Sequence, residues 1–259
     1  MNRTLFHVGG FAAGSYSVLL ALSFVIGAWL AAQRGARRGI KRTAIVDVAL
    51  ISFAAAIVGS RLLHLWLNPD PQRTWADVFA LSQGGLDMYG GVLLAMAASW
   101  LYLRRRQVEF LRVADAVAPS LALGLALTRI GCFLNGCCFG RPTALPWGVS
   151  FPPDCAAHAA FGGAALHPTQ LYSSVWGLAM AALLLAAERS FARPGRLFGL
   201  YLVMDASGRI LLDLFRAYEP GAYLAPGVTV HQAICAGLFV LGTYLLKDHL
   251  RRHHDQHAV

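Results

Sequence analysis

Three arginines lie inside long apolar stretches of this 259-residue chain, namely Arg61, Arg129 and Arg209. A guanidinium group in hydrocarbon costs about 2.5 kcal/mol or more, so charged residues at such positions commonly belong to a functional site. A guanidinium group binds phosphate through two parallel hydrogen bonds, which suits a phospholipid headgroup. The three arginines therefore indicate that the chain binds an anionic lipid.

The nearby carboxylates leave a second interpretation open. Asp213 follows Arg209 by four residues and Arg216 follows it by seven, so one helical face is expected to carry all three. An internal ion pair that only joins helices would explain this spacing equally well. The acidic residues within or near the apolar stretches are few: Asp47, Asp87, Asp115, Asp205 and Asp213.

A group of cysteines, Cys132, Cys137 and Cys138, begins three residues after Arg129. Three interpretations stay open: inert packing of small apolar side chains, a redox or soft-metal site, and a nucleophile that forms a covalent adduct with a lipid. No histidine flanks the Cys137–Cys138 pair closely. From the sequence we assign no metal and no organic cofactor to the chain.

The elements that must position these residues are apolar helices. The chain is 57% hydrophobic and 14% charged, and about 20 apolar residues suffice for a helix that crosses the bilayer. Only helices satisfy the backbone of such segments in lipid. We expect an all-α integral membrane protein with seven transmembrane helices, at 14–32, 44–67, 86–103, 114–134, 169–187, 196–215 and 228–246.

The charge pattern predicts how these helices are oriented. The net charge is +9, and its basic clusters at 34–42, 104–112, 189–196 and 247–252 lie at the ends of apolar stretches. The positive-inside rule then places the N-terminus outside and the C-terminus in the cytoplasm. This placement is not that of a nucleic-acid surface. We expect one transmembrane domain over residues 1–259, an uncleaved first helix, and an extracytoplasmic loop at about 135–168.

Residues 129–152, RIGCFLNGCCFGRPTALPWGVSFP, resemble the signature of the prolipoprotein diacylglyceryl transferase family, R-x-G-N-F-x-N-G-E-x-x-G-R-P. The segments GGLDMYGG (84–91), HPTQLY (167–172) and GRILLDLFR (208–216) resemble the family's G-G-x-x-x-H-G-G, H-P-[ST]-Q-L-Y and R-x-x-x-E-x-F-R. The order and spacing of these segments agree with the family, and the resemblance covers nearly the whole chain.

The resemblance implies an enzyme of the bacterial cytoplasmic (inner) membrane. Its partners would be phosphatidylglycerol, or another anionic phospholipid, and the lipobox of a preprolipoprotein, whose cysteine thiol receives the diacylglyceryl group. Arg129 and Arg209 would hold the phosphate. Together with the charge pattern, the resemblance predicts further substrate contacts from Arg61, Asn135, Gly136, Gly140, Arg141, Gln170, Tyr172, Asp213 and Arg216.

Four positions depart from the family pattern. Tyr89 stands at the motif histidine, Cys132 at an asparagine, Cys137 at the acidic residue, and Asp213 at a glutamate. A tyrosine with a pKa of about 10 is a poor base at neutral pH, although it donates a hydrogen bond readily.

His167 is the alternative base, unless it only orients the start of a helix. The expected catalytic set is Arg129, Arg209, Tyr89, His167, Cys137 and Cys138.

Two other classes of function remain open because of these departures. One is a related membrane enzyme with another acceptor, or with thiol chemistry at Cys137 and Cys138. The other is a non-catalytic binder or transporter of phospholipid, anions or a soft metal, since embedded arginines serve anion transport equally well.

Overall fold

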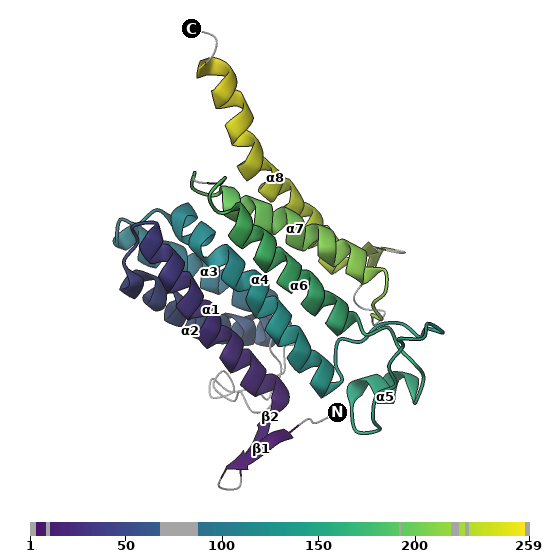
Figure 1. Cartoon of the computed structure of the whole chain (residues 1–259). Coiled ribbons are helices and arrows are strands. Elements are labelled where there is room, and N and C mark those ends of the chain that lie inside the picture. The colour runs from purple at the N-terminus through teal and green to yellow at the C-terminus, as the bar shows by residue number, and fades with distance from the viewer. Residues whose placement is uncertain are drawn as a thin grey trace. The chain divides into compact units, whose positions relative to one another are not determined.

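The computed structural model describes residues 4–8, 11–67, 88–191, 193–218, 223–225 and 228–256. The helices are α1 (Ser15–Arg37), α2 (Arg42–Leu67), α3 (Met88–Arg105), α4 (Phe110–Asn135), α5 (Ala156–Phe161), α6 (Thr169–Ala187), α7 (Arg196–Asp213) and α8 (Val230–Gln256) (Figure 1). Two short antiparallel hairpins accompany them, β1 (Thr4–Val8) with β2 (Phe11–Gly14) and β3 (Tyr223–Ala225) with β4 (Val228–Thr229).

The long helices confirm an α-helical protein that crosses the membrane several times. Among the described residues, five helical segments are long and apolar enough to cross a bilayer: α1, α2, α4, α6 and residues 230–247 of α8. The other two predicted spans correspond to α3 and α7, each 18 residues long. Helix α7 carries Arg196, Asp205, Arg209 and Asp213, which lower its mean hydropathy. Two of these four charged residues, Arg209 and Asp213, belong to the predicted site.

The chain forms two compact units, one of residues 1–30 and 114–259 and the other of residues 31–113. In the second unit, α2 and α3 pack closely because glycines face each other. A Cβ atom on Gly59 would lie 2.3 Å from the carbonyl oxygen of Gly90, and small residues of this kind let membrane helices approach. Polar contacts reinforce the pair, since Tyr102 donates a hydrogen bond to Asp47 and the hydroxyls of Ser52 and Ser99 lie 2.7 Å apart.

The first unit is a row of helices in the order α1, α4, α6, α7 and α8 (Figure 1). The Ser174 hydroxyl of α6 donates to the Ala126 carbonyl of α4 at 2.9 Å. Met180, Leu184 and Leu197 are fully buried in the core that α4, α6 and α7 share. This packing aligns the ends of α4 and α7 with the start of α6, where the predicted site residues lie.

A buried carboxylate joins the starts of α4 and α7. Asp115 on α4 accepts hydrogen bonds from the backbone N–H groups of Gly195 (2.9 Å) and Phe198 (2.8 Å). The first N–H groups of a helix lack partners within the helix, and a negative charge there is favourable. Asp115 therefore caps α7 from another helix.

The segment between α4 and α6, residues 136–168, is an ordered loop that contains α5. Phe151, Cys155, Ala157 and Leu166 form a small buried core inside it. The loop is also linked by short β-bridges, such as Val149 with Leu166. The loop is therefore a structured element beside the helix ends.

Candidate active site

The end of α7 carries an ion pair between two of its own residues, Arg209 and Asp213. Arg209 Nε lies 3.3 Å from Asp213 Oδ1, and the side chains are 21% and 0% exposed. The Tyr218 hydroxyl donates to Asp213 Oδ1 at 2.5 Å and accepts from Arg209 Nη2 at 3.3 Å. The Thr229 hydroxyl donates to Asp213 Oδ2 at 3.5 Å. Of the two interpretations of this spacing, the internal ion pair is therefore present for Arg209.

Arg216 reaches this group from outside the helix. The expectation that one helical face carries all three residues is wrong for Arg216, because α7 ends at Asp213 and the chain turns at 214–215; Arg209 and Asp213 do share a face. The guanidinium carbon of Arg216 lies 5.0 Å from the centre of the Tyr218 ring, a cation–π contact. Burial and the hydrogen bond to Asp213 raise the pKa of Tyr218 to about 12. The phenol is therefore neutral at physiological pH.

Positive charge exceeds negative charge in this region. Arg129 is half-buried on α4, and its guanidinium group forms no ion pair or hydrogen bond with a described residue. Burial and the neighbouring charge of Arg209 lower the pKa of Arg216, and Arg129 adds to this effect. The region thus contains the three guanidinium groups of Arg129, Arg209 and Arg216. Its carboxylates are two, those of Asp205 and Asp213. An anion placed among the arginines would balance the remaining charge.

A backbone junction connects the loop after α4 with the start of α6 and the turn after α7. Gly140 N donates to the His167 carbonyl at 3.1 Å, and His167 N donates to the Arg141 carbonyl at 3.0 Å. Arg141 N donates to the Phe215 carbonyl at 2.8 Å, and its exposed side chain donates from Nε to the Arg216 carbonyl at 3.0 Å. A Cβ atom on Gly140 would lie 2.6 Å from the Cβ atom of His167. The close approach at Gly140 is thus between segments of the protein.

Aromatic side chains lie against this junction. The His167 ring centre lies 5.2 Å from that of Phe215, and His167 Nδ1 lies 3.4 Å from the Tyr172 hydroxyl. Trp147 Nε1 donates to the same hydroxyl at 2.8 Å. His167 does not cap α6 through its side chain, since Pro168 occupies the N-cap position. Its half-buried imidazole is a candidate proton acceptor.

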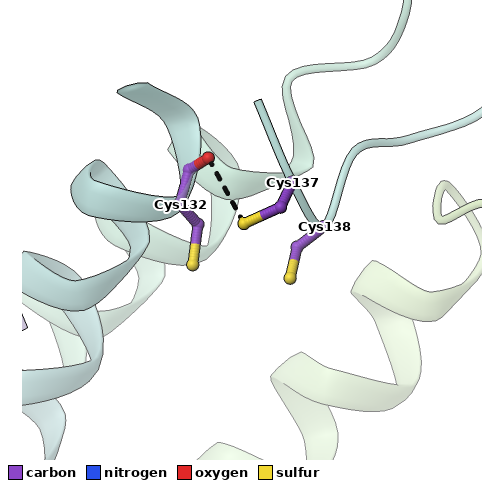
Figure 2. Close-up of side chains that lie close together, drawn as sticks. All are labelled: Cys132, Cys137 and Cys138. Atoms are coloured by element: carbon purple, nitrogen blue, oxygen red, sulfur yellow. Dashed lines mark hydrogen bonds between the residues drawn. The ribbon is translucent and has the colours of Figure 1, made fainter. Parts of the chain in front are cut away.

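The cysteines come together at the end of α4. Cys132 is on the helix, and Cys137 and Cys138 follow in the turn, with their side chains directed toward a common space (Figure 2). The three sulfur atoms lie within 4.8 Å of one another. Hydrogen bonds from the thiols of Cys132 and Cys137, and the charges of Arg129 and Arg216, lower the pKa of Cys138. The thiols therefore lie within the field of the arginine cluster.

Two buried side chains of α6 hold the cysteine turn in place. Thr169 Oγ1 donates to the Cys138 carbonyl at 3.0 Å, and Gln170 Nε2 donates to the Cys137 carbonyl at 2.8 Å. Gln170 was expected to contact substrate. Its amide nitrogen holds the protein backbone, while its buried Oε1 atom has no hydrogen-bond partner in the described part of the chain, so the substrate contact stays a prediction.

The remaining predicted residues are placed as follows. Asn135 is the last residue of α4 and is half-buried, and Gly136 follows it with a φ of +69°. Arg61 is buried on α2 and Tyr89 is half-buried in the first turn of α3, both in the second unit. Residues 84–87 of the GGLDMYGG segment, which include Asp87, lie outside the described residues.

Reasoning from the sequence did not find Tyr218, Thr229, Thr169 or Trp147. Only two of them carried a usable signal. Tyr218 follows Asp213 by five residues, and Thr169 belongs to the HPTQLY segment. Nothing in the local sequence of Thr229 or Trp147 connects them with Asp213 or Tyr172.

An apolar groove of about 410 Å³ runs between α6 and α7. Its lining includes Tyr172, Val175, Trp176 and Leu212, and Tyr172 also belongs to the aromatic group at the junction. The groove therefore begins beside the polar site. An apolar space of this kind could hold an acyl chain.

These features define a multi-pass membrane protein with a site suited to an amphiphilic anion. The sequence comparison identifies the family: the chain belongs to the prolipoprotein diacylglyceryl transferase family, whose model matches residues 3–247. The predicted resemblance is therefore confirmed.

Curated relatives named phosphatidylglycerol–prolipoprotein diacylglyceryl transferase match over most of their length. The protein from Clostridium tetani is 31% identical over 221 residues, which cover 85% of this chain and 88% of the relative. The protein from Cutibacterium acnes is 32% identical over 244 residues, 91% of this chain and 82% of the relative. The protein from Acaryochloris marina is 36% identical over 215 residues, 82% and 78% respectively.

Proposed function

We propose that this protein transfers the diacylglyceryl group of phosphatidylglycerol to the lipobox cysteine thiol of a prolipoprotein. The observation that carries the proposal is the family match over residues 3–247, within which the arginine cluster lies. The excess of guanidinium groups over carboxylates supports it, because the substrate has an anionic headgroup.

The proposed location of the protein is the bacterial cytoplasmic membrane, in which the chain would form one transmembrane domain. Its seven long helices would cross the bilayer, with the N-terminus outside and the C-terminus in the cytoplasm. The basic clusters at 34–42 and 104–112 support this orientation. The ends of α4 and α7 would then face the outer leaflet, where a prolipoprotein presents its lipobox.

In the proposed reaction, the thiolate sulfur attacks the glycerol carbon that is bonded to the phosphate. A carbon–sulfur bond forms as the carbon–oxygen bond breaks, and glycerol phosphate leaves with the electron pair. Negative charge grows on the departing phosphate, so fixed cations beside it lower the barrier. Arg129, Arg209 and Arg216 supply these cations, and the groove between α6 and α7 takes an acyl chain.

The thiol proton needs an acceptor, and His167 is our candidate. Its imidazole is half-buried beside the hydroxyl of Tyr172, and its backbone is fixed by the Gly140 junction. The family's motif histidine has no counterpart at position 89, which is a tyrosine. His167→Ala should therefore lower transfer more at pH 6 than at pH 9, where solvent deprotonates more of the acceptor thiol.

The decisive experiment reconstitutes the full chain in liposomes that contain phosphatidylglycerol and adds a peptide with one lipobox cysteine. Mass spectrometry should detect the thioether-linked peptide and an equal amount of glycerol phosphate. Liposomes of zwitterionic phosphatidylethanolamine should give neither product.

Release of glycerol phosphate without the thioether would show a different acceptor. Absence of both products, with protein that unfolds cooperatively on heating, would overturn the proposal. Tyr89→His tests the divergent motif position, since a gain in transfer would show that Tyr89 limits the rate.

A further inference from the structure

The three thiols at the end of α4 have the geometry of a ligand set. Their sulfur atoms lie within 4.8 Å of one another, on side chains that converge (Figure 2). Metal–thiolate bonds of about 2.3 Å place the sulfurs of a three-coordinate site about 4.0 Å apart. Closing the cluster onto one ion therefore needs sulfur movements of less than about 1 Å, which side-chain rotation supplies. The sequence left a redox or soft-metal site open as one of three interpretations of these cysteines, and their convergence favours it.

The backbone that carries the cluster is fixed before any ligand arrives. Thr169 and Gln170 hold the carbonyl groups of Cys138 and Cys137, and both of these side chains are fully buried. Cys138 itself has a φ of +58°, a conformation that non-glycine residues seldom adopt. Such strain persists where surrounding contacts impose it, and it is frequent at functional sites. The turn is thus built to present Cys138 beside its two neighbours.

The surrounding charges favour a metal–thiolate complex over a bare cation. Three thiolates with one monovalent cation carry a net charge of −2. The positive charges of Arg129 and Arg216 act on Cys138 and would balance that complex. The same charges disfavour hard cations bound by neutral oxygen ligands. The cluster is therefore suited to an ion that binds thiolate strongly.

The number of ligands distinguishes between thiophilic ions. Structural zinc sites almost always use four protein ligands. Within the described residues, no histidine, aspartate or glutamate joins the three cysteines, and Cys155 and Cys235 are not part of the cluster. Thiolate ligands also select Cu⁺, for which three sulfurs complete a site.

We propose that Cys132, Cys137 and Cys138 form a three-thiolate binding site for Cu⁺. Binding replaces the thiol protons, which pass to the solvent, by three sulfur–copper bonds, and no atom changes oxidation state. The proposal goes beyond the transferase function and does not depend on it, because copper binding is measured without either substrate.

The test uses the full chain in lipid nanodiscs, with its thiols reduced and oxygen excluded. Cu⁺ is titrated in competition with a chromophoric Cu⁺ chelator. We expect one Cu⁺ retained per chain, an X-ray absorption spectrum with three sulfur neighbours, and an increase in the unfolding temperature. Cys132→Ser, Cys137→Ser and Cys138→Ser should each weaken Cu⁺ binding at least tenfold.

Matched controls are available in the same chain. Cys155→Ser changes a buried cysteine of the neighbouring loop, whose thiol donates to the Pro152 carbonyl as a serine hydroxyl also can. Cys235→Ser changes a buried cysteine of α8. A variant with His253, His254 and His257 replaced by alanine excludes metal bound by the C-terminal tail. All three should retain one Cu⁺ with wild-type affinity.

Several outcomes would overturn the proposal. They are no Cu⁺ retained by folded protein, equal retention in the three cluster variants, or one Zn²⁺ retained in preference to Cu⁺. A serine variant that does not fold is replaced by the corresponding alanine variant. The unfolding temperature with and without Cu⁺ shows in each case whether a folded protein was tested.

Discussion

The ends of α4 and α7 both carry a half-buried arginine, but the two arginines have different surroundings. Arg209 on α7 is paired with Asp213 and bonded to Tyr218, whereas Arg129 on α4 has no carboxylate of the described residues within ion-pair distance and acts on Asp205 only at longer range. An ion pair inside a protein fixes the geometry of both side chains, and each charge then largely compensates the other. We infer that α7 contributes the rigid side of the site, and that α4 contributes the charge that a ligand neutralises.

The largest expected effect is that of Arg129→Ala. If Arg129 neutralises the departing phosphate, its removal should lower transfer by about 10²-fold or more. Thioether formation in the liposome assay measures the effect, and Arg129→Lys should restore part of it because the charge returns without the planar fork. Arg112→Ala is the control, since Arg112 is exposed and pairs with Glu109. Full activity of Arg129→Ala would contradict the contrast between the two helices.

Asp213→Asn should have an intermediate effect on transfer, because it changes both the charge and the position of Arg209. The substitution frees the charge of Arg209 but removes the partner that positions it. We expect kcat to fall roughly 10- to 100-fold, in keeping with the roughly 1.5–3 kcal/mol of a hydrogen bond to a charged group, while KM for phosphatidylglycerol also falls. A rise in KM would show that Asp213 contacts the acceptor or the lipid rather than Arg209. Asp213→Glu, the family's residue, is the informative second variant.

Gly140→Ala tests whether the junction holds the two helix ends together. The new methyl group would lie 2.6 Å from His167 Cβ and 2.7 Å from the Phe215 carbonyl oxygen. Overpacking of this kind costs about 1–3 kcal/mol, so the unfolding temperature and the transfer rate should both decrease. Gly163→Ala, in the same loop with nothing within 4 Å of the added carbon, is the control. Equal unfolding temperatures and transfer rates of the two variants would show that the close contact at Gly140 does not hold the helix ends together.

The smallest effect is expected for Tyr218→Phe, and it depends on pH. The protein raises the pKa of Tyr218 from 10.0 to about 12, which means that the fold favours the neutral phenol. This contribution to stability is complete below pH 10 and disappears as the pH rises through about 12. Between pH 9 and pH 11, the unfolding temperature should therefore fall more for the wild type than for Tyr218→Phe. Absorbance of tyrosinate near 295 nm should show one more late-titrating tyrosine in the wild type than in the variant.

Sequence reasoning located the helices and the charged residues but not their pairing. Apolar length and basic flanks report the cost of transfer into lipid, so six of the helices end within about five residues of their predicted ranges, whereas α8 continues beyond its predicted end at 246 to Gln256. Whether Asp213 binds Arg209 or Arg216 depends on where α7 ends, and helix ends are poorly fixed by local sequence.

The contacts of Gln170 and Thr229 were inaccessible to sequence reasoning for another reason. Gln170 binds a carbonyl group 33 residues away, and Thr229 binds Asp213 across 16 residues. Such pairs are set by tertiary packing rather than by spacing. The convergence of Cys132 with Cys137 and Cys138 likewise depends on the turn at Gly136 and on the side chains of α6 that hold it.

The cap that Asp115 places on α7 limits how these helices can move. At 1.5 Å per residue, Asp115 lies about 21 Å along α4 from Arg129, and Phe198 lies about 16 Å along α7 from Arg209. The two helices are thus tied at one extremity by a buried carboxylate, and their cationic extremities lie far from that tie. Because the backbone junction of Arg141 with Phe215 ties the opposite ends as well, α4 and α7 are expected to keep their spacing, and rotation of the Arg129 side chain rather than separation of the helices would admit a headgroup.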